Sequence, residues 1–211
     1  YVLRMLYSQG LSYDALAVPR NDGVTVADPR SAWRTFAEHY HLFVGTPSRL
    51  WIDHSLNWAF DVDEPLCAGN ADSIYDLINA RLGNDDLKPR AILDRANVAY
   101  IATTEFALDP LLHHNKLAKD GLNDRITTTY RPDDVTDPDH PDFHTNLQQL
   151  ATLTGQDVAD WDGLIEAHRI RRQHFRQHGA TATDHGVPSA ATADLAPAEK
   201  QALLTRVMKT P

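Results

Sequence analysis

The feature that most constrains the fold of this sequence is a change in hydrophobic period near Asn97. After this residue, three short runs of apolar and β-branched residues alternate with stretches of helical period, and the runs span residues 98–103, 126–130 and 180–184. Buried strands have this length and composition, and strands that alternate with helices favour right-handed β-α-β units with a parallel sheet. The second half of the chain is therefore predicted to be an α/β fold with three adjacent parallel strands.

The residues before this change have helical character. Asp28 and Pro29 are typical of a helix start, because Asp caps free N–H groups and Pro is tolerated in the first turn. The apolar residues that follow recur at helical spacing and predict one buried face, formed by Trp33, Phe36, Ala37, Tyr40 and Phe43. Because large aromatic residues are usually buried, all four tryptophans are expected in the core: Trp33, Trp51, Trp58 and Trp161.

These two patterns together indicate a fold class. A complete (β/α)8 barrel needs about 250 residues, and three strands cannot close one. With 211 residues, the chain is expected to hold part of a TIM-type (β/α)8 barrel together with a helical insertion subdomain. Residues 1–96 are the expected insertion, and residues 97–211 are the expected barrel part, which would be the catalytic domain.

Charge and composition argue against several classes of partner. The formal net charge is -9, from 20 basic and 29 acidic residues, so nucleic acid and anionic membrane surfaces would be repelled on average. Cys67 is the only cysteine, which excludes an internal disulfide and a cysteine-based zinc cluster. No apolar run reaches the length of about 18 residues that a membrane-spanning helix needs. A cytoplasmic protein that binds neither nucleic acid nor membrane is expected.

An ionisable residue follows each of the three predicted strands: Glu105, Arg131 and Asp184. Ligands collect at the carboxyl ends of parallel strands, so these side chains are candidates for one site. A guanidinium can bind a carboxylate or two hydroxyls, and a carboxylate can orient a hydroxyl or relay a proton. The alternative is that strand ends are polar because they meet solvent, with Arg131 paired to Asp133 or Asp134 and Asp184 capping its loop.

Two histidine pairs resemble metal-binding motifs but favour other interpretations. His39 and His41 lie two apart in a helical segment, where their side chains diverge by roughly 200°. His174 and His178 are one helical turn apart, but no glutamate follows His174 as a zinc-protease motif requires. The second pair favours a solvated basic face, because it lies among Arg171, Arg172 and Arg176. No metal ligand is predicted within this chain.

Segments in order along nearly the whole chain resemble the uronate isomerases, members of the metal-dependent amidohydrolase superfamily. They include Asp-Pro-Arg at 28–30, Tyr-His-Leu-Phe at 40–43, Gly-Thr-Pro-Ser-Arg-Leu-Trp at 45–51, Thr-Thr at 103–104, Leu-Leu-His-His at 111–114, Tyr-Arg-Pro-Asp at 130–133 and Thr-Asp-His-Gly at 183–186. The resemblance implies aldose-ketose isomerisation of D-glucuronate to D-fructuronate and of D-galacturonate to D-tagaturonate. It also implies a barrel with a helical insertion and a homo-oligomer.

The resemblance also implies roles for individual residues. Arg131 and Asp184 match active-site positions and are expected to bind the substrate and to act in catalysis, and Tyr1 matches a tyrosine that could shuttle a proton. Glu105 stands where the family has Asp and is expected to bind substrate. A divalent metal, zinc by expectation, would act in the intact enzyme, but its ligands are expected outside this chain, before Tyr1 and after Pro211.

Two other functions stay open at this level. A metal-dependent hydrolase of the same superfamily would use the same barrel, and its distinguishing ligands and loops would lie outside this chain. A non-catalytic fragment that lacks the metal site is the second alternative. Metal content and turnover distinguish these classes.

Overall fold

The computed structural model describes residues 2–24, 27–187, 189 and 191–209. The chain divides into two compact units, Tyr1–Asn97 and Val98–Pro211. Each unit has its own hydrophobic core. Among the described residues, no helix combines the length and the apolar character that crossing a membrane requires.

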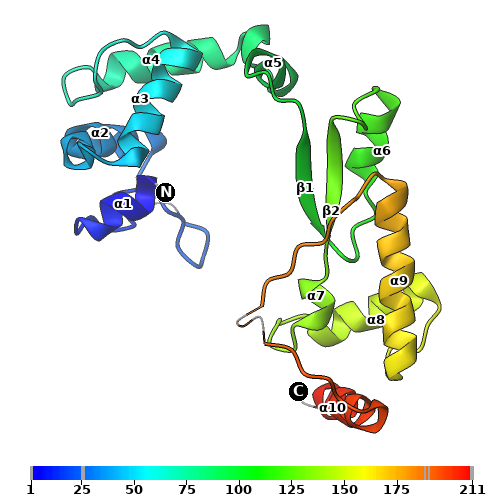
Figure 1. Cartoon of the computed structure of the whole chain (residues 1–211). Helices are drawn as coiled ribbons and strands as arrows, with labels where there is room; N and C mark the ends of the chain where they lie inside the picture. Colours follow the sequence, from blue (N-terminus) through cyan, green and yellow to red (C-terminus); the bar gives the residue numbers. More distant parts are fainter. Residues whose placement is uncertain (1, 25–26, 188, 190, 210–211) are drawn as a thin grey trace. The chain divides into compact units, whose positions relative to one another are not determined.

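The first unit is built from helices (Figure 1): α1 (Val2–Ser8), α2 (Pro29–His39), the 3-10 helix η1 (Tyr40–Phe43), α3 (Pro47–Phe60), α4 (Ala71–Leu82), the 3-10 helix η2 (Asp85–Leu87) and α5 (Pro89–Arg95). Both α2 and α3 begin at a proline after a capping side chain. The Asp28 carboxylate accepts a hydrogen bond from Ser31 N at 3.0 Å, and Thr46 Oγ1 accepts one from Arg49 N at 3.2 Å. These caps satisfy N–H groups that the first helical turn leaves free.

The predicted apolar face of α2 and η1 is confirmed: Phe36, Ala37, Tyr40 and Phe43 are buried, and Trp33 is partly buried and packs against them. The placement of all four tryptophans in the core was wrong for Trp51, which is 65% exposed. On α3 it is Leu56 that enters the core, and Trp51 lies five residues earlier. Five residues correspond to a rotation of about 140° around a helix, which turns Trp51 away from the core.

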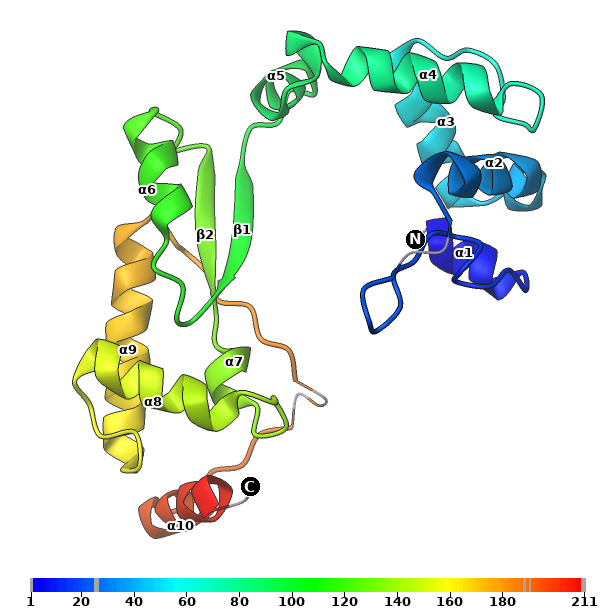
Figure 2. The same ribbon diagram turned by 180° about the vertical axis from the view of Figure 1, so that it is seen from behind.

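The second unit contains strands and helices: β1 (Ile101–Phe106), α6 (Leu112–Lys119), β2 (Ile126–Arg131), α7 (Asp133–Thr136), α8 (Phe143–Thr154), α9 (Trp161–Gln177) and α10 (Pro197–Lys209). The predicted parallel pairing of the first two strands is confirmed, in register from Ile101 with Ile126 to Phe106 with Arg131. Helices α6 and α9 contact β2 and lie beside it in both views (Figures 1 and 2).

The third predicted strand, residues 180–184, is reduced to a single parallel bridge between Thr183 and Tyr130. Asp184 N donates to Tyr130 O at 3.0 Å, and Tyr130 N donates to Ala182 O at 3.4 Å. The segment runs beside β2 in the predicted direction, but it bridges at one position, and its two alanines, which strands disfavour, offer little surface to pack. The described residues thus form a two-stranded parallel sheet with a bridged third segment, and this sheet does not by itself establish a barrel.

Candidate functional site

The carboxyl end of β2 brings Arg131 and Asp184 together. Nη2 of Arg131 lies 3.7 Å from Oδ2 of Asp184, and the two side chains are 36% and 45% exposed, so a ligand can reach both. The bridge at Tyr130 and Thr183 explains this arrangement. Residues that follow a parallel bridge leave the sheet on the same side, which places Arg131 and Asp184 next to each other.

The carboxylate of Asp133 connects the end of β2 with the loop that carries Asp184. Arg131 Nε donates to Asp133 Oδ2 at 2.8 Å, and Gly186 N donates to Asp133 Oδ1 at 2.9 Å. One guanidinium therefore lies against two carboxylates, with a local formal charge of about -1. Such a cluster can bind the hydroxyl and carbonyl oxygens of a polar ligand, whereas an anionic group would need further cations.

Glu105 is not part of this cluster, and it lies within β1, which extends to Phe106, rather than after the strand as predicted. Parallel partners in register point to the same face, so Glu105 shares the face of Tyr130, while Phe106 shares the face of Arg131. The Glu105 carboxylate accepts a hydrogen bond from the hydroxyl of Thr128 and lies 3.8 Å from Nε2 of His114 on α6. It is thus turned toward a helix. Tyr1, the fourth candidate, lies outside the described residues.

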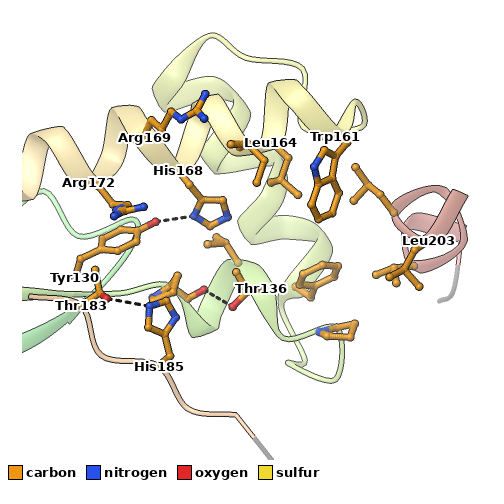
Figure 3. Close-up of a pocket in the computed structure, with 17 residues that line it drawn as sticks. Tyr130, Thr136, Trp161, Leu164, His168, Arg169, Arg172, Thr183, His185 and Leu203 are labelled. Atoms are coloured by element: carbon orange, nitrogen blue, oxygen red, sulfur yellow. Dashed lines mark hydrogen bonds between the residues drawn. The ribbon is translucent and has the colours of Figure 1, made fainter. Parts of the chain in front are cut away.

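A cavity of about 720 Å³ lies on the other face of the same strand ends (Figure 3). Tyr130 and Thr183 line it, and each directly precedes a residue of the Arg131–Asp184 cluster. Successive side chains in extended segments point to opposite faces, so the cavity and the cluster are separate features. The cavity has apolar walls from α8, α9 and α10, formed by Phe143, Trp161, Leu164, Leu203, Leu204 and Val207.

One polar contact at this cavity joins Tyr130 and His168, whose hydroxyl and Nδ1 lie 2.8 Å apart, and another joins Thr183 Oγ1 and His185 Nε2 at 3.0 Å. Burial raises the pKa of Tyr130, and the pKa of His168 is lowered by burial and by the nearby Arg172 and His185. His168 is therefore neutral, and the tautomer of its ring determines whether Tyr130 or Nδ1 donates the hydrogen bond. The sequence offered only a weak signal for this pair, because His168 has the spacing of the apolar face of its helix.

The loop between β1 and α6 is fixed by two buried charged residues. Arg171 donates from Nε to Ala107 O at 2.7 Å and from Nη2 to Asp109 O at 2.9 Å, while Asp134 Oδ1 accepts from Ala107 N at 3.3 Å. Burial lowers the pKa of Arg171 and raises the pKa of Asp134. The prediction of a solvated basic face on α9 was therefore wrong for Arg171, which is only 7% exposed.

The described residues do not fit a metal site by themselves. No group of three or more His, Cys, Asp or Glu side chains among them could hold an ion, and protein-bound zinc usually has three or four such ligands. His39 Nδ1 donates to Thr35 O at 2.8 Å, and His41 Nδ1 donates to Glu38 O at 2.9 Å. Each of these rings is thus held against its own turn of helix.

Comparisons with known proteins agree on one family. A family model described as glucuronate isomerase matches residues 17–210. A uronate isomerase from Xanthomonas oryzae pv. oryzae is 53% identical over 99% of this chain and 44% of its own length, and one from Phenylobacterium zucineum is 46% identical over 99% and 43%. The chain thus spans less than half the length of these relatives.

Two solved structures have the same fold as this chain. The glucuronate isomerase from Caulobacter crescentus matches with a TM-score of 0.91 and 46% identity, over 99% of this chain and 44% of its own. The uronate isomerase from Thermotoga maritima matches with a TM-score of 0.88 over 100% of this chain and 45% of its own. Its identity is 22%, so this second match concerns the fold alone.

Proposed function

The chain belongs to the glucuronate isomerase family, and we propose that it is part of an enzyme that interconverts hexuronates by aldose-ketose isomerisation. The proposed reactions are D-glucuronate to D-fructuronate and D-galacturonate to D-tagaturonate. The observation that carries this proposal is the accessible pair of Arg131 and Asp184, 3.7 Å apart at the carboxyl end of β2 and within the matched residues.

The reaction needs groups that move protons and stabilise an enediolate. A proton leaves C2 of the open-chain aldose, a proton is added at C1, and the hydroxyl proton on O2 is exchanged for one on O1. We assign Arg131 to the oxygens on which negative charge develops, where a fixed guanidinium donor stabilises the transition state. We assign Asp184 to a substrate hydroxyl, whose proton it can accept and return. Because the cluster is formally negative, the substrate carboxylate is expected to bind elsewhere in the full-length protein.

The proposal extends to the rest of the enzyme. We include a divalent cation, zinc by expectation, which would supply positive charge at the reacting oxygens when bound. By themselves, the described residues provide no donor set for it. Glu105 and Tyr1 stay in the proposal as a substrate-binding and a proton-shuttling residue. Residues 1–96 are proposed as a helical insertion in a TIM-type barrel, and a cytoplasmic homo-oligomer is proposed.

The test uses the full-length protein with D-glucuronate and D-galacturonate in deuterated water. Isomerisation through an enediolate places solvent deuterium at C1 of the ketose, or at C2 of the aldose on reversal, which NMR detects. A hydrolase of the same superfamily would leave both sugars unlabelled, and a non-catalytic protein would turn over neither. A folded full-length protein that converts neither uronate would contradict the proposal.

A further inference from the structure

One carboxylate joins both strand ends of the candidate site. Asp133 Oδ2 accepts from Arg131 Nε at 2.8 Å, while Asp133 Oδ1 accepts from Gly186 N at 2.9 Å. Asp133 is the first residue of α7, two residues after Arg131 at the end of β2, and Gly186 follows Asp184 by two residues. The carboxylate therefore fixes a side chain on β2 and the backbone of the loop that carries Asp184.

A side chain at position 186 would disturb this contact. A Cβ built on Gly186 would lie 2.8 Å from Asp133 Oδ2 and 3.5 Å from its Cγ. Side-chain carbons do not approach a carboxylate oxygen that closely, so any larger residue would displace the carboxylate from Arg131 or from the Gly186 amide. A surface ion pair that played no part in the site would not depend on a glycine in a different segment.

The Nε contact also sets the orientation of the guanidinium. A planar guanidinium presents its donors in a fixed fork, so binding Nε to Asp133 determines where the Nη atoms point. Here Nη2 points toward Asp184, at 3.7 Å from its Oδ2. The side chain of Asp133 is 21% exposed, against 36% for Arg131, so Asp133 is the less accessible of the two to a ligand.

We propose that Asp133 is a positioning residue, which orients Arg131 through Nε and fixes the Asp184 loop through the Gly186 amide. This inference rests on the proposed function, in which Arg131 and Asp184 contact the sugar acid. Asp133 itself contacts Arg131 and Gly186 and acts through them. The aspartate at position 133 and the glycine at position 186 therefore form one functional unit.

The test is a double-mutant cycle on kcat/KM in the full-length protein. Asp133→Ala should lower kcat/KM by about 10- to 100-fold, because small displacements of a catalytic group are costly. In an Arg131→Met background, the part of this loss that acts through Arg131 should disappear, so that Asp133→Ala has clearly less effect there. Gly186→Ala should reproduce the loss while keeping the carboxylate. The matched control is Asp139→Ala, which removes an exposed carboxylate from the same connection and should leave kcat/KM unchanged.

A second measurement does not depend on turnover. Selective ¹⁵N labelling of arginine makes the Nε–H groups visible by NMR, and the signal of Arg131 is the one that disappears in Arg131→Met. In Asp133→Ala, this Nε–H signal should shift, and its proton should exchange faster with solvent. If Asp133→Ala does not fold, Asp133→Asn, which keeps the shape, takes its place in both measurements. An unchanged Nε–H signal, or an equal loss of activity in both backgrounds, would overturn the inference. Absence of uronate turnover in the parent protein would instead overturn the proposed function.

Discussion

The hydroxyl group of Tyr130 on β2 lies 2.8 Å from Nδ1 of His168 on α9, at the cavity in Figure 3. Burial lowers the pKa of His168, and the positive charges of Arg172 and His185 lower it further. Protonating His168 would therefore place a charge in a buried position between the sheet and its longest neighbouring helix. The burial of this ring gives the fold a dependence on pH with a definite sign.

The first prediction concerns His168→Gln, which keeps an acceptor and removes the titration. The pKa of His168 is lowered by burial from its ordinary value of about 6.5, so the unfolded chain binds the proton more tightly. The stabilisation that comes from the neutral form of His168 is present above about pH 6.5, and it is lost as the pH falls through the pKa of His168 in the folded protein. The parent protein should thus lose more stability than the variant between about pH 7.5 and about pH 5 in urea unfolding. The exposed His113, replaced by Gln, is the control, and an equal pH dependence in parent and variant would refute the prediction.

Asp134→Asn should change the pH dependence of stability in the opposite direction. Burial raises the pKa of Asp134, so the folded state holds the proton more tightly and stability is lost as the pH rises from about 3.9 through the folded pKa. An asparagine oxygen can still accept from Ala107 N and does not ionise. The variant should therefore be at least as stable as the parent at neutral pH, with the difference shrinking toward about pH 4. Thermal unfolding at several pH values measures this, and a variant clearly less stable at neutral pH would show that the charge is needed.

Arg171→Met should destabilise the second unit. The substitution removes two hydrogen bonds and leaves the carbonyls of Ala107 and Asp109 without these donors, at a cost of about 2 to 3 kcal/mol. The exposed Arg176, replaced by Met on the same helix, should change stability by less than about 0.5 kcal/mol. Chemical denaturation compares the two. An equal loss of stability in the two variants would mean that the buried guanidinium of Arg171 contributes no more to stability than the exposed one of Arg176.

These residues show which features could be predicted from the sequence. The capping residues and the helical period predicted the buried face of α2, because both depend on local spacing. The alternation of strand-like and helical segments predicted the parallel pairing of β1 with β2. The side to which Glu105 points depends on the register between two strands, and one residue of shift reverses it. Burial of Arg171 depends on carbonyls more than sixty positions away in the chain, which no local pattern contains.

The His39 and His41 pair is predicted to bind no metal jointly. Each Nδ1 donates to a backbone carbonyl of the preceding turn, which holds the two rings against different parts of the helix. Among the described residues, no group of three possible ligands includes this pair. Replacing both by Asn in the full-length protein should leave the metal stoichiometry unchanged, as measured by elemental analysis of the purified protein. Loss of one equivalent of metal with the circular dichroism spectrum intact would show that the pair does hold an ion.

The last prediction concerns the proposed site: Arg131→Met and Asp184→Asn should each reduce uronate isomerisation in the full-length protein while leaving folding nearly intact. Both side chains are partly exposed and 3.7 Å apart, so they contribute little to the core. Losing a charge-assisted contact to the reacting sugar acid costs about 1.5 to 3 kcal/mol, or about one to two decades in rate if that contact strengthens in the transition state. An ion pair that only lies at the surface contributes about 0 to 1 kcal/mol to stability and nothing to chemistry. Steady-state kinetics on both uronates provide the measurement, with Arg176→Met and Asp139→Asn as charge-matched controls at exposed positions. Near-parental turnover in both site variants, with folded protein shown by circular dichroism, would remove Arg131 and Asp184 from the mechanism even though the family membership would stand.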